Sequence, residues 1–229
     1  RAVADRLGFV YVDTGAMYRA VALAALRRGV ALDDPEAMGG VARAVTIAFD
    51  VTGTRLLLDG EDVSAAIRTA EVTRNTRYAA SAPPVRTELV RRQQELAADR
   101  QVVMEGRDIT TVVLPHARWK FYLDASVACR ARRRQADLAA AGEPADLAVI
   151  ADEIEARDRS DRERAVGPLR RTDDQIYLDT SDLSPEAVVD RIVTRVRADA
   201  DASLRTAPRT QMNKVDARNS PSPPGRGPG

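Results

Sequence analysis

Cysteine and histidine are almost absent from this chain of 229 residues, which has one of each, Cys129 and His116. One cysteine cannot form an internal disulfide and suits a reducing compartment, so we expect a cytoplasmic protein in which Cys129 is a small buried apolar side chain. No serine or cysteine pattern accompanies His116, which favours a structural or exposed histidine over a catalytic base. No run approaches the roughly 20 apolar residues of a membrane span, so no membrane partner is expected.

Aromatic residues, net charge and lysine are scarce as well. Aromatics make up 4% of the chain and the net charge is +1, which argues against a nucleic-acid module, because such modules use stacking platforms and a basic excess. Of the 35 basic residues only Lys120 and Lys214 are lysines. Arginine is the better planar, bidentate phosphate ligand, so its clusters are candidate phosphate sites. The phosphate loop G-x-x-x-x-G-K-[ST] does not occur in residues 1–229.

The chain does contain short apolar runs that alternate with helix-like segments. Four of these runs have the character of buried strands and end in polar residues: Phe9–Val12, Gln101–Met104, Trp119–Leu123 and Gln175–Leu178. This order predicts an α/β protein with a parallel sheet. Ligands of such sheets gather at the carboxyl ends of the strands, so the polar tips should converge. Helices are predicted for 16–28 and from Ser184 onward, where a serine cap precedes a proline.

Residues 45–64 have a different pattern, with short apolar runs around a Thr52-Gly53 turn. They predict an antiparallel insert, followed by a loop and by a helix that Pro83 begins. We therefore expect core structure in 1–35, a substrate-binding insert in 36–100, and core again in 101–198. The segment 199–229 becomes rich in Pro, Gly and Ser toward its end and is predicted to be a disordered tail.

Two strand tips carry residues that could bind a ligand or take part in a reaction. At the first, Asp13 or Thr14 could simply cap the following helix, but Arg19 lies in its first turns, where the helix dipole favours acids. An arginine there is better accommodated if it binds an anion. At the second, Glu105-Gly106-Arg107-Asp108 combines a glycine with opposite charges directly after an apolar strand. A plain surface turn is the alternative in this case.

A third candidate segment is EIEARDRSDRER, which runs from Glu153 to Arg164. Its i,i+4 pairs, such as Asp158–Arg162, are in the favourable order, and a solvated salt-bridged helix would explain them. The run breaks at Gly167-Pro168, which fits a mobile lid over about 153–171. Arginines on a closing lid can position and neutralise a transferred phosphoryl group. The arginines at 130 and 132–134 are interpreted as helix surface.

Five segments together resemble the bacterial cytidylate kinases, in order and at the family's spacing. They are DTGAMYRA (13–20), LDGEDVSAAIRT (58–69), PPVRTELVRRQQ (83–94), EGRDITTVVLPHA (105–117) and RDRSDRERAVGPL (157–169). The resemblance implies the P-loop nucleoside monophosphate kinase fold, a parallel sheet with helices on both faces and a small antiparallel insert domain. It also implies that the family's first strand and P-loop are absent from this chain, which starts at Arg1 as if inside a helix.

By the same resemblance, a group of residues would bind the acceptor CMP. Thr14 stands where the family has a serine or threonine near the cytosine, while Arg19, Arg86 and Arg107 would hold the acceptor phosphate. Asp108 would contact the sugar or the base edge. Where the family often has a serine near cytosine, this chain has Arg77.

A second group would serve the transfer step. Asp161 would bind the ribose hydroxyls, and Arg157 and Arg164 would reach the transferred phosphoryl group together with Arg107. Glu105 would lie near the water shell of Mg²⁺. The implied reaction moves the γ-phosphoryl group of ATP, with Mg²⁺, to CMP or dCMP and gives CDP or dCDP plus ADP. The complete enzyme is expected to be a monomer.

Two alternatives remain open from the sequence. The missing phosphate loop favours a catalytically inactive fragment or pseudoenzyme that retains only nucleotide binding. The second alternative is a P-loop kinase that acts on a different small molecule, and the antiparallel insert argues against it.

Overall fold

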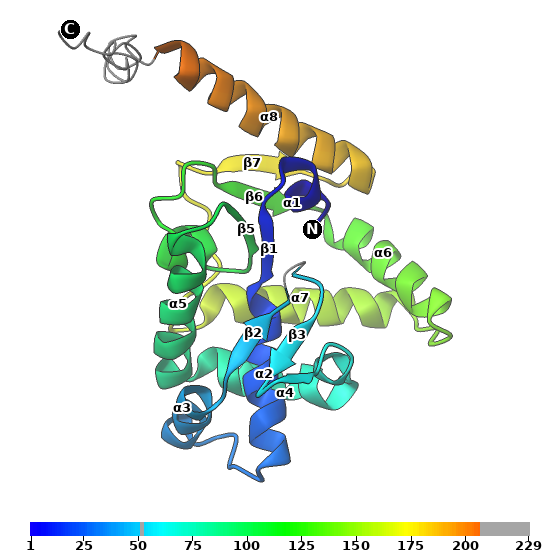
Figure 1. Cartoon of the computed structure of the whole chain (residues 1–229). Coiled ribbons are helices and arrows are strands. Elements are labelled where there is room, and N and C mark those ends of the chain that lie inside the picture. The colour runs from blue at the N-terminus through cyan, green and yellow to red at the C-terminus, as the bar shows by residue number, and fades with distance from the viewer. Residues whose placement is uncertain (51–52, 207–229) are drawn as a thin grey trace, which may run out of the picture.

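The computed structural model describes residues 1–50 and 53–206, with side chains through residue 200. The four predicted parallel strands are present, but they form two separate pairs (Figure 1). β1 (Val10–Asp13) pairs with β5 (Val102–Glu105), and β6 (Phe121–Asp124) pairs with β7 (Ile176–Asp179). The pairs are separate because, within the described residues, no strand links β5 to β6. The register nevertheless aligns Asp13 with Glu105 and Asp124 with Asp179, so each pair ends in acidic residues.

The first and last helices of the described chain are in contact. α1 (Ala2–Leu7) packs against α8 (Pro185–Thr206), with an ion pair between Arg6 and Asp190 and a hydrogen bond from Arg197 to the Arg6 carbonyl. The Ser184 hydroxyl accepts from the Ala187 amide at 3.1 Å, which confirms the predicted cap. α8 continues through Thr206, so the predicted disordered tail is wrong for 199–206. The rest of that tail, 207–229, lies outside the described residues.

The antiparallel insert is confirmed. β2 (Ile47–Phe49), β3 (Leu56–Leu58) and β4 (Glu61–Asp62) pair in order, and α5 (Pro83–Ala98) begins at the predicted proline. The predicted loop between them is wrong, because the 3₁₀ turn η1 (Ala66–Arg68) and α4 (Ala70–Ser81) occupy it. Only Val72 and Ala79 of α4 are buried, so few apolar residues marked this helix in the sequence. α3 (Pro35–Ala44) had not been predicted either.

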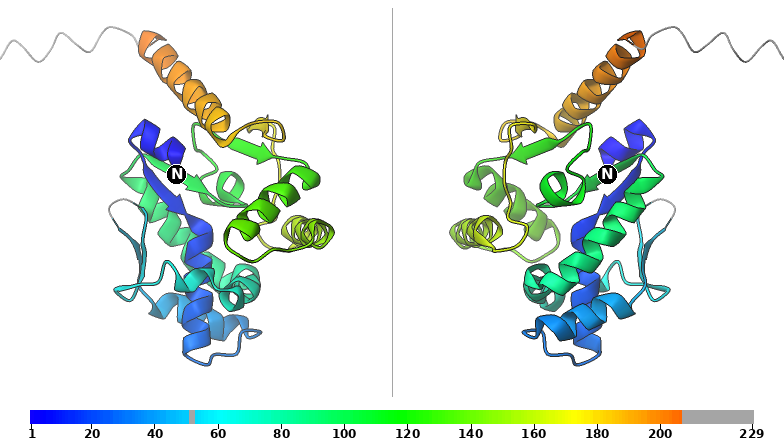
Figure 2. Two further views of the ribbon diagram at one scale, coloured as in Figure 1. Left: turned by 90° about the vertical axis from the view of Figure 1, so that its right-hand side faces the viewer. Right: turned by 90° about the vertical axis from the view of Figure 1, so that its left-hand side faces the viewer.

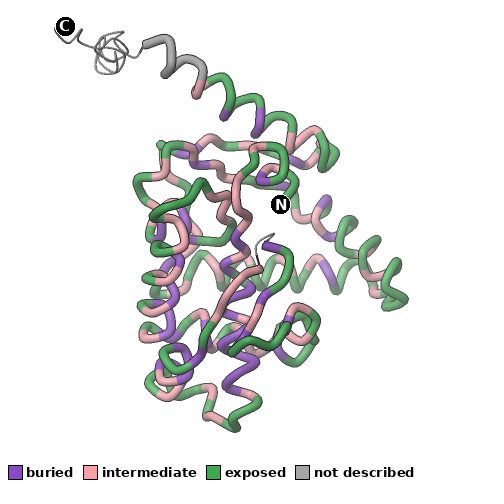
Figure 3. Tube along the Cα trace, in the orientation of Figure 1, coloured by how far each residue is buried: buried purple, intermediate pink, exposed green. Residues whose placement is uncertain are grey.

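The main hydrophobic core surrounds α2 (Thr14–Arg27), whose side chains are buried over most of its length (Figure 3). α3, α4, α5 and the β2–β3 hairpin pack around it. α6 (Val127–Ala140) and α7 (Leu147–Glu163) pack on each other on the opposite side of α2 from the hairpin (Figure 2). The tips of β1 and β5 therefore lie between the α2–α5 core and α7. None of the helices in the described part of the chain is long and apolar enough to cross a membrane.

Candidate active site

The centre of the site is a buried ion pair between Arg86 on α5 and Asp108, which follows β5. Both residues are about 5% exposed. Arg86 also donates to the Tyr18 hydroxyl at 3.4 Å, and burial raises the pKa of that tyrosine. The Arg86 Nε atom is buried and has no hydrogen-bond partner. Arg86 can therefore donate to one more acceptor. Binding such an acceptor would be favourable, because a buried donor without a partner costs free energy.

The turn after α7 closes over this pair. Arg164, at the end of α7, donates to the Gly167 carbonyl, and its Nη2 lies 3.9 Å from Asp108 Oδ1. Gly167 has φ +59, and a Cβ atom there would lie 2.5 Å from Asp108 Oδ2 and 2.6 Å from Arg86 Cζ. Glycine is therefore required both for the left-handed backbone and for the close approach. Burial lowers the pKa of the Arg164 guanidinium, which the charge of Asp108 partly offsets.

Three arginines lie within ion-pair distance of Asp161 on α7. It accepts a hydrogen bond from Arg107 Nε at 2.7 Å, and Arg157 and Arg164 each have a nitrogen 4.0 Å from it. Arg107 and Arg157 remain largely accessible, since 42% and 66% of their side-chain surfaces are exposed. The structure thus brings the tip of β5 and the end of α7 together.

Arg19 differs from Arg86 and Arg107 because it has no carboxylate hydrogen-bond partner among the described residues. Its Nη1 donates to Thr73 Oγ1 at 2.7 Å and to the Ile67 carbonyl at 3.3 Å. Burial, together with the charges of Arg157 and Arg68, lowers the pKa of Arg19. The guanidinium remains protonated all the same, since arginine titrates far above neutral pH. Positive charge therefore exceeds negative charge around Arg19, which suits an incoming anion.

At the tip of β1, Asp13 and not Thr14 caps α2, because the Asp13 carboxylate accepts from the Ala16 amide at 3.0 Å. Thr14 instead donates to the Glu105 carbonyl at 2.7 Å and ties β1 to β5. A Cβ at Gly106 would lie 2.5 Å from Thr14 Oγ1, so this contact requires glycine. The Glu105 carboxylate accepts from the Tyr11 hydroxyl at 2.6 Å.

Magnesium bound mainly through nucleotide phosphates needs only one or two protein carboxylates, often through water. The described residues contain no cluster of three or more acidic, histidine or cysteine side chains that could hold an ion alone. Glu105 is exposed at the strand tip and fits the lesser role of a ligand through water. With the nucleotide present, the cation would neutralise phosphate charge there.

Several contacts were missed by the sequence reasoning. Arg130 on α6, interpreted as helix surface, donates two hydrogen bonds to Asp158 on α7, at 2.9 and 2.7 Å. Arg133 likewise donates to the Thr180 and Leu183 carbonyls after β7. No local signal separated these two from their neighbour Arg132, because each partner is distant in sequence.

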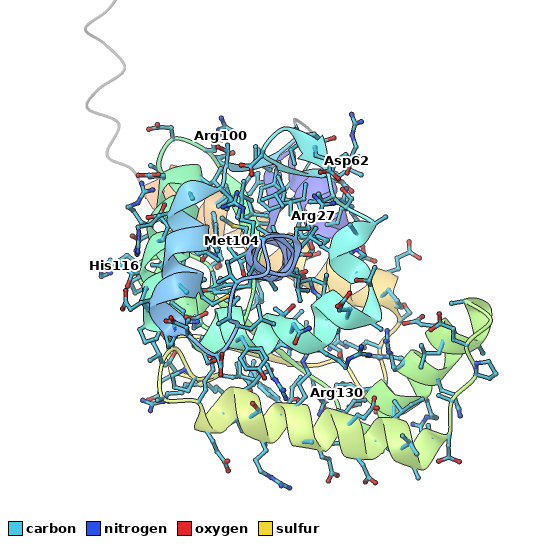
Figure 4. The ribbon with its side chains drawn as sticks, turned by 90° about the horizontal axis from the view of Figure 1, so that it is seen from below. Arg27, Asp62, Arg100, Met104, His116 and Arg130 are labelled. Atoms are coloured by element: carbon cyan, nitrogen blue, oxygen red, sulfur yellow. The ribbon has the colours of Figure 1, made fainter. Side chains whose placement is uncertain are left out.

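Two other residues, Arg77 and His116, form no ion pair with Asp108 or Asp161 in the described part of the chain. Arg77 stacks on the adjacent Tyr78 ring, with Cζ 4.8 Å from the ring centre, and donates to its hydroxyl. His116 is exposed and lies at the edge of the molecule, far from Arg130 (Figure 4). The described site offers it no role.

The sequence model of the cytidylate kinase family matches residues 1–198. The chain belongs to the cytidylate kinase family. Relatives include a cytidylate kinase of Geobacillus sp., 47% identical over 193 residues, which are 83% of this chain and 86% of that protein. A cytidylate kinase of Anoxybacillus flavithermus is 45% identical over 197 residues, 85% of this chain and 88% of that protein. A bifunctional pantoate ligase/cytidylate kinase of Synechococcus sp. is 45% identical over 202 residues, 86% of this chain and 37% of that protein.

Membership of the cytidylate kinases confirms the resemblance drawn from the five segments, all of which lie inside the matched range. It makes the chain a member of an enzyme family with the P-loop nucleoside monophosphate kinase fold. The α/β architecture with parallel strand pairs agrees with that fold.

Proposed function

We propose that this cytidylate kinase chain binds CMP or dCMP as phosphoryl acceptor, with ATP and Mg²⁺ as the donor, and that the products are CDP or dCDP and ADP. The observation that carries the proposal is the convergence of arginines from α2, α5, the tip of β5 and α7. Two of them, Arg86 and Arg107, are paired with aspartates, whereas Arg19 has no carboxylate hydrogen-bond partner among the described residues. The acceptor phosphate is assigned to these three arginines.

In this proposal the chain acts by positioning and by charge. The attacking phosphate oxygen of CMP is already anionic, so no general base is needed. Phosphoryl transfer depends mainly on alignment and on neutralising the charge of the transferred group. Arg157 and Arg164 lie at the end of α7, beside the acceptor arginines, and would supply that charge. Asp161 is assigned to the ribose hydroxyls, Asp108 to the sugar or base edge, and Thr14 to the vicinity of the cytosine.

The donor side supports a second candidate, a chain that binds CMP without turning it over. Residues 1–229 contain no G-x-x-x-x-G-K-[ST] loop, whose amides and lysine hold the donor phosphates. Lys120 cannot replace that lysine, because it is buried and paired with Asp174. Lys214 lies outside the described residues. The buried, free Cys129 fits the cytoplasmic setting expected for either function.

Binding and turnover should be measured separately. Calorimetric titration of the chain with CMP, dCMP, UMP and AMP tests the acceptor site, and CMP and dCMP should bind at least tenfold more tightly than AMP. CDP formation from CMP and Mg-ATP should then be assayed with residues 1–229 and with the same chain preceded by a strand and a Gly-rich phosphate loop. Activity only in the extended form supports both assignments. Preference for AMP in either assay would overturn the proposed acceptor.

A further inference from the structure

α7 carries three of the proposed site residues but has little apolar anchoring. Ile150 is its one buried residue. Arg157, Asp161 and Arg164 all lie at its other end or just beyond it. A helix held so weakly by apolar packing depends on polar contacts for its exact placement over the site.

The strongest such contact is made by Arg130 on α6. Its Nη1 and Nη2 donate to the two carboxylate oxygens of Asp158 at 2.9 and 2.7 Å, and its Nε donates to the Ala125 carbonyl at 2.9 Å. All three guanidinium nitrogens of Arg130 therefore donate a hydrogen bond. Ala125 directly follows β6, so Arg130 connects α7 to the tip of a strand. In Figure 4 Arg130 lies against α7.

The pair is charged and partly protected from water. The side chains of Arg130 and Asp158 are 31% and 18% exposed. The hydrogen bonds from Arg130 lower the pKa of Asp158, and those to Asp158 raise the pKa of Arg130. Bidentate, charge-assisted pairs add geometric specificity as well as energy. The exposed i,i+4 partner of Asp158, Arg162, lies farther away, at 3.5 Å.

Asp158 is placed so that this contact governs the site. It precedes Asp161 by three residues, so the two carboxylates lie nearly one helical turn apart on neighbouring positions of α7. One is held by Arg130 from α6 and the other by Arg107 from the tip of β5. Two points of attachment fix both the position of a helix along its axis and its rotation. A displacement of about 1 Å at a phosphoryl-transfer site can cost about 100-fold in rate.

We propose that Arg130 and Asp158 form a clamp that positions α7, and with it Arg157, Asp161 and Arg164, over the acceptor nucleotide. Arg130 is therefore a positioning residue and not a catalytic one. The effect on CMP rests on the proposed function, whereas the effect on α7 does not.

The test uses Arg130→Met, which keeps an unbranched apolar stem, Asp158→Asn, which is nearly isosteric, and the double variant. Arg132→Met on the same helix is the matched control, because Arg132 is exposed. Amide hydrogen exchange over 147–163 is measured without ligand, and CMP affinity is measured by titration. We expect exchange at the end of α7 to rise at least tenfold in each single variant, and CMP to bind about tenfold more weakly. The double variant should be no worse than the singles, because they remove one shared interaction.

Each outcome distinguishes the clamp from ordinary surface. Unchanged exchange in α7 in both single variants would overturn the proposal, as would additive effects in the double variant. A fall in melting temperature with unaltered CMP affinity would make the pair merely structural and would also overturn it. If Arg130→Met fails to fold, Asp158→Asn carries the same test. A wild-type chain that does not bind CMP refutes the proposed function, while the exchange data still decide whether the clamp holds α7.

Discussion

Replacing Gly167 by alanine should open the lid turn without unfolding the protein. Gly167 has φ +59, where alanine costs about 1–2 kcal/mol. The new Cβ would also lie 2.6 Å from Arg86 Cζ and 2.5 Å from Asp108 Oδ2, well inside van der Waals contact. These two side chains cannot give way, because breaking a buried ion pair costs about 3–5 kcal/mol. Lifting the turn after α7 is the less costly response.

The matched control is Gly29→Ala, because Gly29 has φ +63 and no atom beyond its own chain neighbours lies within 4 Å of the position of its Cβ. Both variants carry the backbone strain, and only Gly167→Ala carries the clash. We expect Gly167→Ala to weaken CMP binding at least tenfold, about 1.4 kcal/mol, and Gly29→Ala to change it less than twofold. Calorimetric titration measures the affinities and thermal melting checks the fold. Equal CMP affinity in the two variants would refute the argument that the lid turn must rest on the Arg86–Asp108 pair.

Three further predictions concern single side chains. Arg86→Met should destabilise the fold by about 3–5 kcal/mol in urea unfolding, because Asp108 would be left buried without its partner; a loss below 1 kcal/mol would contradict this. Arg107→Ala should weaken CMP binding at least about tenfold, because charge-assisted hydrogen bonds contribute about 1.5–3 kcal/mol. Arg107→Lys should recover little of this affinity, because an ammonium lacks the planar fork. An unchanged CMP affinity of Arg107→Ala in a titration would make Arg107 an ordinary surface residue. Because Arg130 lowers the pKa of Asp158, this carboxylate stabilises the fold above its unfolded pKa of about 3.9, and the contribution is lost as pH falls through the lower folded value. Unfolding between pH 6 and 2 should therefore show a flatter acid decline for Asp158→Asn than for wild type, and parallel curves would contradict the pair.

Local sequence determined the strands, the antiparallel hairpin and the capped start of α8. These features depend on short-range patterns, namely apolar runs, turn residues and a serine before a proline, which act within a few residues. The same patterns failed for α4, where only Val72 and Ala79 face the core. They failed again at 199–206, where α8 continues beyond the point at which the composition changes.

The tertiary structure alone decided which charges meet. From the sequence, Arg130 was one arginine of a basic run, and Asp158 was expected to pair with Arg162 along its own helix. In the fold Asp158 binds Arg130 from α6 more closely, because packing of α6 on α7 brings two residues 28 positions apart into bidentate contact. The place of Arg19 near a helix start indicates an anion-binding residue, but only the fold shows that its hydrogen bonds go to a hydroxyl and a carbonyl. Charge pairing depends on distances between elements, and no local pattern encodes those distances.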